Sequence, residues 1–158
     1  MNLLFLCTGN TCRSPMADVI ARAELAQRGI RGVVVGSAGV GAWEGAPASD
    51  AAILVAYEHG LDLSSHVARQ LSATMVKDAD LILCMGASHV ERAVALGGDG
   101  RAHLLTAYAQ GGDDRQHRGV SIADPFGGDL TTYRRAFDDI QAAVFASLDR
   151  LFPDQSAQ

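Results

Sequence analysis

The chain has 158 residues, of which 48% are hydrophobic, and it carries a formal net charge of −5 at pH 7. This length fits one domain with a sizeable core, and the negative charge argues against nucleic acid or an anionic membrane as a partner. The three cysteines are an odd count, and no apolar run reaches transmembrane length. These features favour a cytoplasmic protein with reduced thiols.

The segment from Leu3 to Pro15 combines a predicted strand, a loop and a predicted helix start. Leu3 to Cys7 form an apolar run suited to a buried strand. Ser14-Pro15 then has the pattern of a helix N-cap followed by proline at the first helical position. Because backbone N–H groups and the positive end of the helix dipole meet in such a loop, the loop is suited to bind an anion.

Cys7 and Arg13 bracket this loop with five residues between them. A loop curled between them would place the thiol at its floor and the guanidinium at its rim, where arginine can hold two oxygens of a phosphate. The same positive field favours the thiolate, so Cys7 is the candidate nucleophile. A buried strand cysteine and a solvated arginine are the alternative, but Gly9, Asn10 and the Ser14-Pro15 pattern agree with the functional interpretation.

The apolar patterns that follow predict alternating helices and strands. A helix after Pro15 ends near Gly29, and a short buried strand, Val33 to Val35, follows and ends at Gly36 to Gly39. A strand, a helix and a strand in so few residues imply a right-handed crossover and a parallel sheet. Further along, the patterns predict a helix capped at Ser49 or Asp50, a strand at Asp80 to Met85, a helix with a Ser88/Glu91 capping box, a strand at Ala102 to Leu105, and a final helix that Pro153 ends.

Several other side chains have two interpretations. Trp43 lies in a glycine- and alanine-rich segment at the carboxyl end of a strand, where ligands bind in open α/β sheets, so it either walls a pocket or packs beneath its own loop. Cys84 lies inside an apolar strand and is interpreted as an inert core thiol. Four histidines lack the paired spacing of zinc ligands, so we expect no metal: His59, His89, His103 and His117.

Asp124 begins a turn-rich segment, Asp124 to Gly128, just before the last helix. Asp-Pro pairs are common at turns for conformational reasons alone. A thiolate that displaces a leaving group from phosphorus also needs a proton donor on the opposite side, and a carboxylic acid suits that role. Asp124 is therefore the candidate general acid, which would return as the base that activates water.

Together these motifs resemble the low-molecular-weight protein tyrosine phosphatase family, most closely its bacterial branch that includes protein arginine phosphatases. The resemblance is carried by Cys7 to Pro15 (CTGNTCRSP) and by four further segments: Ser37 to Gly39, Ser65 to Gln70, Asp80 to Met85 and Asp124 to Gly128. It implies an α/β fold, a single three-layer domain over residues 1–153 with a central four-stranded parallel sheet flanked by helices. Residues 154–158 would be a C-terminal tail.

The resemblance also implies an activity and the roles of the site residues. It predicts a cysteine-dependent protein phosphatase with a phosphocysteine intermediate and no cofactor, whose catalytic residues are Cys7, Arg13 and Asp124. A network of Asn10, Ser37 and His66 would hold the phosphate-binding loop in shape. That loop would consist of Thr8, Gly9, Asn10, Thr11, Cys12 and Ser14. The partners would be a phosphorylated protein and inorganic phosphate as product, and we expect a monomer.

Two departures from the tyrosine phosphatase pattern bear on the substrate. Thr11 stands where members acting on phosphotyrosine usually carry a larger aliphatic residue, and Phe126-Gly127 replaces a pair of aromatics. A hydroxyl can accept a hydrogen bond from a guanidinium, which an aliphatic wall would desolvate without compensation. We therefore predict a preference for phosphoarginine, with Thr11, Trp43 and Phe126 as specificity residues. Phosphotyrosine is the alternative, and a neutral exchange of threonine for isoleucine at position 11 stays open.

Two other functions and one regulatory hypothesis complete the interpretation. Arsenate reduction uses a similar loop but needs a relay of resolving cysteines, and only Cys84 lies in the relevant region. A catalytically silent phosphate-binding module would lack Cys7 or Asp124, and both are present. Cys12 shares the loop with Cys7, so a Cys7–Cys12 disulfide could shield the nucleophile from over-oxidation. A small apolar filler is the alternative role for Cys12.

Overall fold

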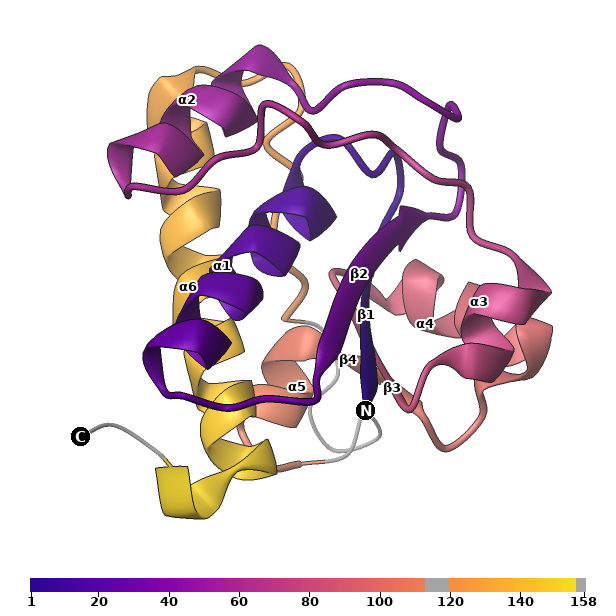
Figure 1. The fold of residues 1–158 in the computed structure, drawn as a ribbon. Helices are drawn as coiled ribbons and strands as arrows, with labels where there is room; N and C mark the ends of the chain where they lie inside the picture. Colours follow the sequence, from indigo (N-terminus) through magenta and orange to yellow (C-terminus); the bar gives the residue numbers. More distant parts are fainter. Residues whose placement is uncertain (113–119, 156–158) are drawn as a thin grey trace.

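A four-stranded parallel sheet forms the centre of the computed structural model, which describes residues 1–112 and 120–155 (Figure 1). The strand order is β2-β1-β3-β4. The strands are β1 Asn2–Cys7, β2 Val34–Gly39, β3 Leu81–Cys84 and β4 Ala102–Leu104. The chain winds from β1 outward to β2 and then returns to the other side of β1, so the winding reverses at the carboxyl end of β1. Ligands bind at such reversal points in open α/β sheets.

Helices cover both faces of the sheet, which confirms the three-layer α/β fold (Figure 1). Helices α1, α2, α5 and α6 pack together on one face, and α3, α4 and a π-helical turn, η1, lie on the other. Each face has its own hydrophobic cluster. The helices are α1 Arg13–Gln27, α2 Asp50–Glu58, α3 Ala73–Asp78, α4 Ala87–Ala93, η1 Val94–Gly98, α5 Leu105–Ala109 and α6 Leu130–Leu151.

The last helix, α6, shows how the sequence pattern becomes packing. Phe137, Ile140, Val144 and Leu148 recur every three or four residues and are all buried. A stripe of that period lies along one helix face, which here packs against α1, α2 and α5 within the hydrophobic cluster on this side of the sheet. The helix ends at Leu151, two residues before Pro153, as the proline predicts.

Two of the predicted helix caps are wrong. Helix α1 begins at Arg13 with Cys12 in the N-cap position and no capping side chain, so Ser14 lies inside the helix. The Ser14 hydroxyl is engaged by Cys7 and Asn10 instead. Helix α4 begins at Ala87 after Gly86 and likewise has no side-chain cap, so Ser88 caps nothing. Ser49 is a true N-cap, because its Oγ accepts a hydrogen bond from the Ala52 N–H at 3.2 Å.

The second strand starts one residue later than predicted and ends within the predicted segment. It begins at Val34, whose side chain is exposed because β2 is an edge strand, and it continues through Gly39. Two guanidinium groups cover carbonyl oxygens of this edge: Arg22 donates to Val35 O at 2.7 Å, and Arg69 donates to Ser37 O at 3.1 Å. Covering the edge in this way limits pairing with other chains.

The described chain ends in a short 3₁₀ turn, Pro153–Gln155. Residues 156–158 of the predicted tail and His117 lie outside the described residues. Within the described part of the chain, no helix is long and apolar enough to span a membrane.

Candidate functional site

The phosphate-binding loop leaves the carboxyl end of β1 and turns directly into α1. Cys7 is the last residue of β1 and is buried. Asn10 is fully buried and has φ of 55°, a left-handed conformation that asparagine adopts more readily than most residues. Gly39 passes the loop so closely that a Cβ there would lie 2.4 Å from the Thr8 carbonyl oxygen. The left-handed backbone at position 10 and the close backbone contact at position 39 therefore limit which amino acids these two positions can hold.

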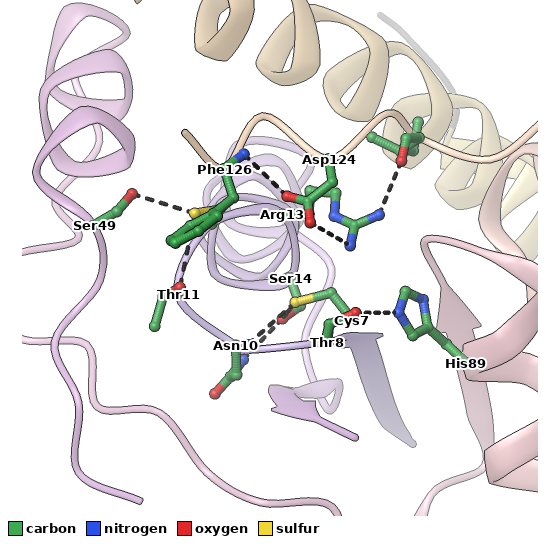
Figure 2. Close-up of polar contacts among 12 residues, drawn as sticks. Cys7, Thr8, Asn10, Thr11, Arg13, Ser14, Ser49, His89, Asp124 and Phe126 are labelled. Atoms are coloured by element: carbon green, nitrogen blue, oxygen red, sulfur yellow. Dashed lines mark hydrogen bonds and ion pairs between the residues drawn. The ribbon is translucent and has the colours of Figure 1, made fainter. Parts of the chain in front are cut away.

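The sulfur of Cys7 lies among hydrogen-bonding groups of the loop and the first helical turn (Figure 2). Cys7 Sγ is 2.8 Å from Ser14 Oγ, and the Asn10 N–H donates to it at 3.3 Å. Ser14 Oγ also accepts a hydrogen bond from Asn10 Nδ2 at 2.8 Å. Its own proton has two acceptors within reach, the sulfur and, at 3.5 Å, the Ala38 carbonyl oxygen. The sulfur of the candidate nucleophile is therefore surrounded by hydrogen-bonding groups and lies beside the start of α1.

The predicted supporting residues meet around the Asn10 side chain and backbone. Asn10 Nδ2 donates to Ser37 Oγ at 2.9 Å as well as to Ser14. His66 Nε2 lies 2.7 Å from the Asn10 carbonyl oxygen, so this nitrogen carries the proton. The Arg69 N–H donates to Asn10 Oδ1 at 2.9 Å, a contact that the sequence interpretation did not assign. The loop is thus tied to β2 and to the segment before α3.

Arg13 and Asp124 face each other at the rim of the loop (Figure 2). The buried Arg13 guanidinium donates through Nη1 to Ile122 O at 2.9 Å, while its Nη2 lies 3.6 Å from Asp124 Oδ2. The Asp124 side chain is 52% exposed, and its Oδ1 accepts the Phe126 N–H at 3.1 Å. Arg13 and Asp124 both line a cavity of about 230 Å³, and the full lining is Cys7, Thr8, Gly9, Thr11, Cys12, Arg13, Asp124 and Phe126.

The structure does not bring Trp43 to this cavity. Its side chain is 83% exposed and is absent from the cavity lining, so it neither walls the pocket nor packs beneath its own loop. Phe126 does line the cavity, although most of its ring is exposed. Within the described part of the chain, no group of three His, Cys, Asp or Glu residues could hold a metal ion.

The three cysteines are free thiols in the structure. Cys12 is buried behind the loop, with Sγ 3.4 Å from both Ser49 Oγ and Tyr133 OH. Burial and the neighbouring Cys12 raise the pKa of Tyr133, so its hydroxyl stays protonated and can donate. The Cys7–Cys12 disulfide stays a prediction.

His89 is a residue of the site that sequence reasoning missed. Its Nε2 lies 2.9 Å from Thr8 Oγ1 (Figure 2). His89 belongs to α4, which follows β3, whereas Ser37 belongs to β2 on the other side of β1. Burial lowers the pKa of His89 to about 4, the Arg13 guanidinium adds to this effect and Asp124 opposes it, so the ring is neutral at neutral pH. The sequence feature that could have indicated a role for His89 is its position shortly after Met85, just beyond the carboxyl end of a strand.

The Asn10 network predicts that loss of the Ser37 hydroxyl weakens anion binding. In Ser37→Ala, Asn10 Nδ2 loses one of its two acceptors, so the loop N–H groups are less well oriented before the anion arrives. We expect inorganic phosphate to bind about tenfold more weakly, which corresponds to one buried hydrogen bond. The measurement is protection of Cys7 from alkylation by iodoacetate as phosphate is added.

Ser147→Ala is the matched control for this experiment. Ser147 is equally buried, but its hydroxyl donates only along α6, to Ala143 O. It should leave phosphate protection unchanged. Equal protection in the Ser37→Ala variant would show that the network does not set the shape of the loop.

Comparisons with known proteins agree with this geometry. Residues 2–156 match the family described as low molecular weight phosphotyrosine protein phosphatase. The chain is 36% identical over 149 residues to a probable low molecular weight protein-tyrosine-phosphatase, EpsP, of Ralstonia nicotianae, with 94% of each chain covered. It is 35% identical over 153 residues to a protein-arginine-phosphatase of Geobacillus stearothermophilus, with 97% of each chain covered.

The likeness extends to solved structures. One of them, a variant of the YwlE arginine phosphatase with a phosphorylated active-site serine, has a TM-score of 0.84 and 29% identity, covering 97% of this chain and 96% of that one. The family match covers nearly the whole chain, and the two relatives align over almost their full lengths. The chain therefore belongs to the low molecular weight phosphotyrosine protein phosphatase family and is a cysteine-based protein phosphatase.

Proposed function

We propose that the protein hydrolyses phosphoarginine side chains of proteins in two displacement steps, with Cys7 as nucleophile. In the first step Cys7 Sγ forms a bond to phosphorus, the bond from phosphorus to the guanidinium nitrogen breaks, and Asp124 protonates that nitrogen. Arg13 and the loop N–H groups hold the equatorial oxygens as charge develops on them. In the second step Asp124 takes a proton from water, which attacks phosphorus and releases the Cys7 thiolate.

Three observations support these roles. Cys7 lines the cavity, while Arg13 and Asp124 face each other at its rim, 3.6 Å apart. Ser14 Oγ, 2.8 Å from the sulfur, is placed to stabilise the thiolate when it leaves phosphorus. The related variant with a phosphorylated active-site serine agrees with a covalent phosphoenzyme in that protein.

The observation that carries the substrate preference is the placement of Thr11. Thr11 lines the cavity, and among the described residues its Oγ1 has one hydrogen-bonding contact, a long one of 3.7 Å to Cys12 Sγ. A guanidinium entering the cavity could therefore donate a hydrogen bond to this hydroxyl, and the Asp124 carboxyl at the rim adds a second acceptor. The likeness to the Geobacillus protein-arginine-phosphatase supports the same preference.

Two other activities are less well supported. Phosphotyrosine is the alternative substrate, because the Ralstonia relative of similar identity is a probable tyrosine phosphatase. Arsenate reduction needs a mobile resolving thiol, and Cys84 is fully buried in β3. Its position does not suit a redox relay.

The preference is tested by kcat/KM on matched peptides that carry phosphoarginine or phosphotyrosine at the same position. We expect phosphoarginine to be favoured by about a hundredfold, which is about 2.7 kcal/mol of transition-state stabilisation. Cys7→Ser serves as the blank for uncatalysed loss of the labile phosphoramidate. A preference for phosphotyrosine would overturn the substrate assignment and leave the phosphatase chemistry in place.

Thr11→Ile tests whether the hydroxyl sets this preference. Isoleucine keeps the β-branched shape but removes the acceptor, so a guanidinium would lose its hydrogen bond on entering the cavity. We expect the ratio of phosphoarginine to phosphotyrosine activity to fall by about tenfold or more. The control is Thr131→Ile, the same exchange at an exposed position of α6. An unchanged ratio in the Thr11→Ile variant would eliminate Thr11 as the specificity residue.

A further inference from the structure

We propose that His89 is a positioning residue for phosphoryl transfer, which acts by holding Thr8 and with it the first half of the phosphate-binding loop. This inference rests on the phosphatase chemistry of the family and does not depend on the preference for phosphoarginine. It assigns a role in the reaction to helix α4, which lies on the face of the sheet opposite α1.

The loop needs an anchor on each side, because its N–H groups must converge on one point. Asn10 is anchored on the β2 side by Ser37, His66 and Arg69. On the other side Thr8, the residue after the nucleophile, contacts His89 Nε2 through Oγ1 at 2.9 Å (Figure 2). The bond reaches across 81 positions of sequence and joins the loop to α4. His89 thus does for Thr8 what the Asn10 network does for the second half of the loop.

The other ring nitrogen shows that packing alone does not explain a histidine at this position. His89 is 3% exposed, and its buried Nδ1 has no hydrogen-bond partner among the residues that the structure describes. An unpaired buried polar atom lowers stability, and native structures keep few of them. An apolar side chain of similar volume would fill the same space without leaving a buried polar atom unpaired. What the histidine provides is therefore the Nε2 contact with Thr8.

The charge state of the ring suits this role. The groups that face it are Arg13 from the start of α1 and Asp124 from the segment before α6. A cationic ring would compete with Arg13 for the anion and be repelled by it, whereas a neutral imidazole anchors Thr8 without changing the charge of the site. Burial and Arg13 keep the pKa of His89 well below its ordinary value, so the ring is neutral at neutral pH before an anion binds.

A double-mutant cycle between His89 and Thr8 tests the proposal with p-nitrophenyl phosphate as substrate. Thr8→Val removes the hydroxyl and keeps the shape, and His89→Leu removes the imidazole and keeps an apolar filling. We expect each change to lower kcat by about tenfold with KM altered less than about threefold, because oriented N–H groups act mainly on charge that develops in the transition state. The double variant should also be about tenfold slower, since both changes break the same contact.

A loss of about a hundredfold in the double variant would mean that the two residues act independently and would overturn the proposal. Parent-like kcat in either single variant would do the same. His89→Gln, which retains a hydrogen-bonding atom at similar reach, should keep kcat within about threefold of the parent, and a tenfold loss in it would also count against the proposal.

Two controls distinguish the loss of the His89–Thr8 contact from other effects of the substitutions. His59→Leu makes the same exchange at an exposed histidine that stacks on Phe137, far from the loop, and should leave kcat unchanged. If His89→Leu does not fold, a comparison of Thr8→Ser with Thr8→Val decides the matter, because serine keeps the hydroxyl that contacts His89 and should have the higher kcat by about threefold or more. Equal kcat values in these two variants would overturn the proposal. No hydrolysis by the parent chain would contradict the phosphatase assignment itself, a failure distinct from additivity in the cycle.

Discussion

The structure depends on one constraint: the N–H groups of a short loop must point at one place before an anion arrives there. A flexible loop would lose conformational entropy on binding, so the orientation has to be established by the fold. Asn10 meets this requirement in a left-handed conformation, fully buried, with its amide and carbonyl groups bonded to Ser14, Ser37, His66 and Arg69. These bonds connect the loop beside the Cys7 cavity to α1, to β2 and to the segment before α3.

The topology brings these partners to one place. Strand β1 lies between β2 and β3, and the chain reverses its winding direction there, so segments from both sides converge at the carboxyl end of β1. Ser37 comes from β2, His89 comes from α4 after β3, and Asp124 comes from the segment before α6. Thr8 and His89 are 81 positions apart in the sequence. They meet because β1, which precedes Thr8, lies beside β3, which precedes α4. The acidic chain thus concentrates its anion-binding groups at one point on its surface.

Local pattern was enough to predict the strands, the last helix and the loop that carries Cys7 and Arg13. The predicted caps at Ser14 and Ser88 were wrong because a capping pattern records only local preference, and Ser14 is engaged by Cys7 and Asn10. His89 was missed because its partner is distant in sequence and a single histidine has no spacing to interpret. Trp43 was placed near the pocket from its segment alone, which cannot tell which way a loop side chain points.

The most direct test of the account is to find the phosphoryl group on Cys7 during turnover. The protein would be mixed with a phosphorylated peptide, quenched rapidly, and digested, and fragmentation mass spectrometry would locate the added phosphoryl group. The account predicts it on Cys7, not on Cys12, and predicts that it accumulates when Asp124→Ala slows its hydrolysis. Turnover by the parent with no phosphoryl group on Cys7 in either protein would contradict the central claim.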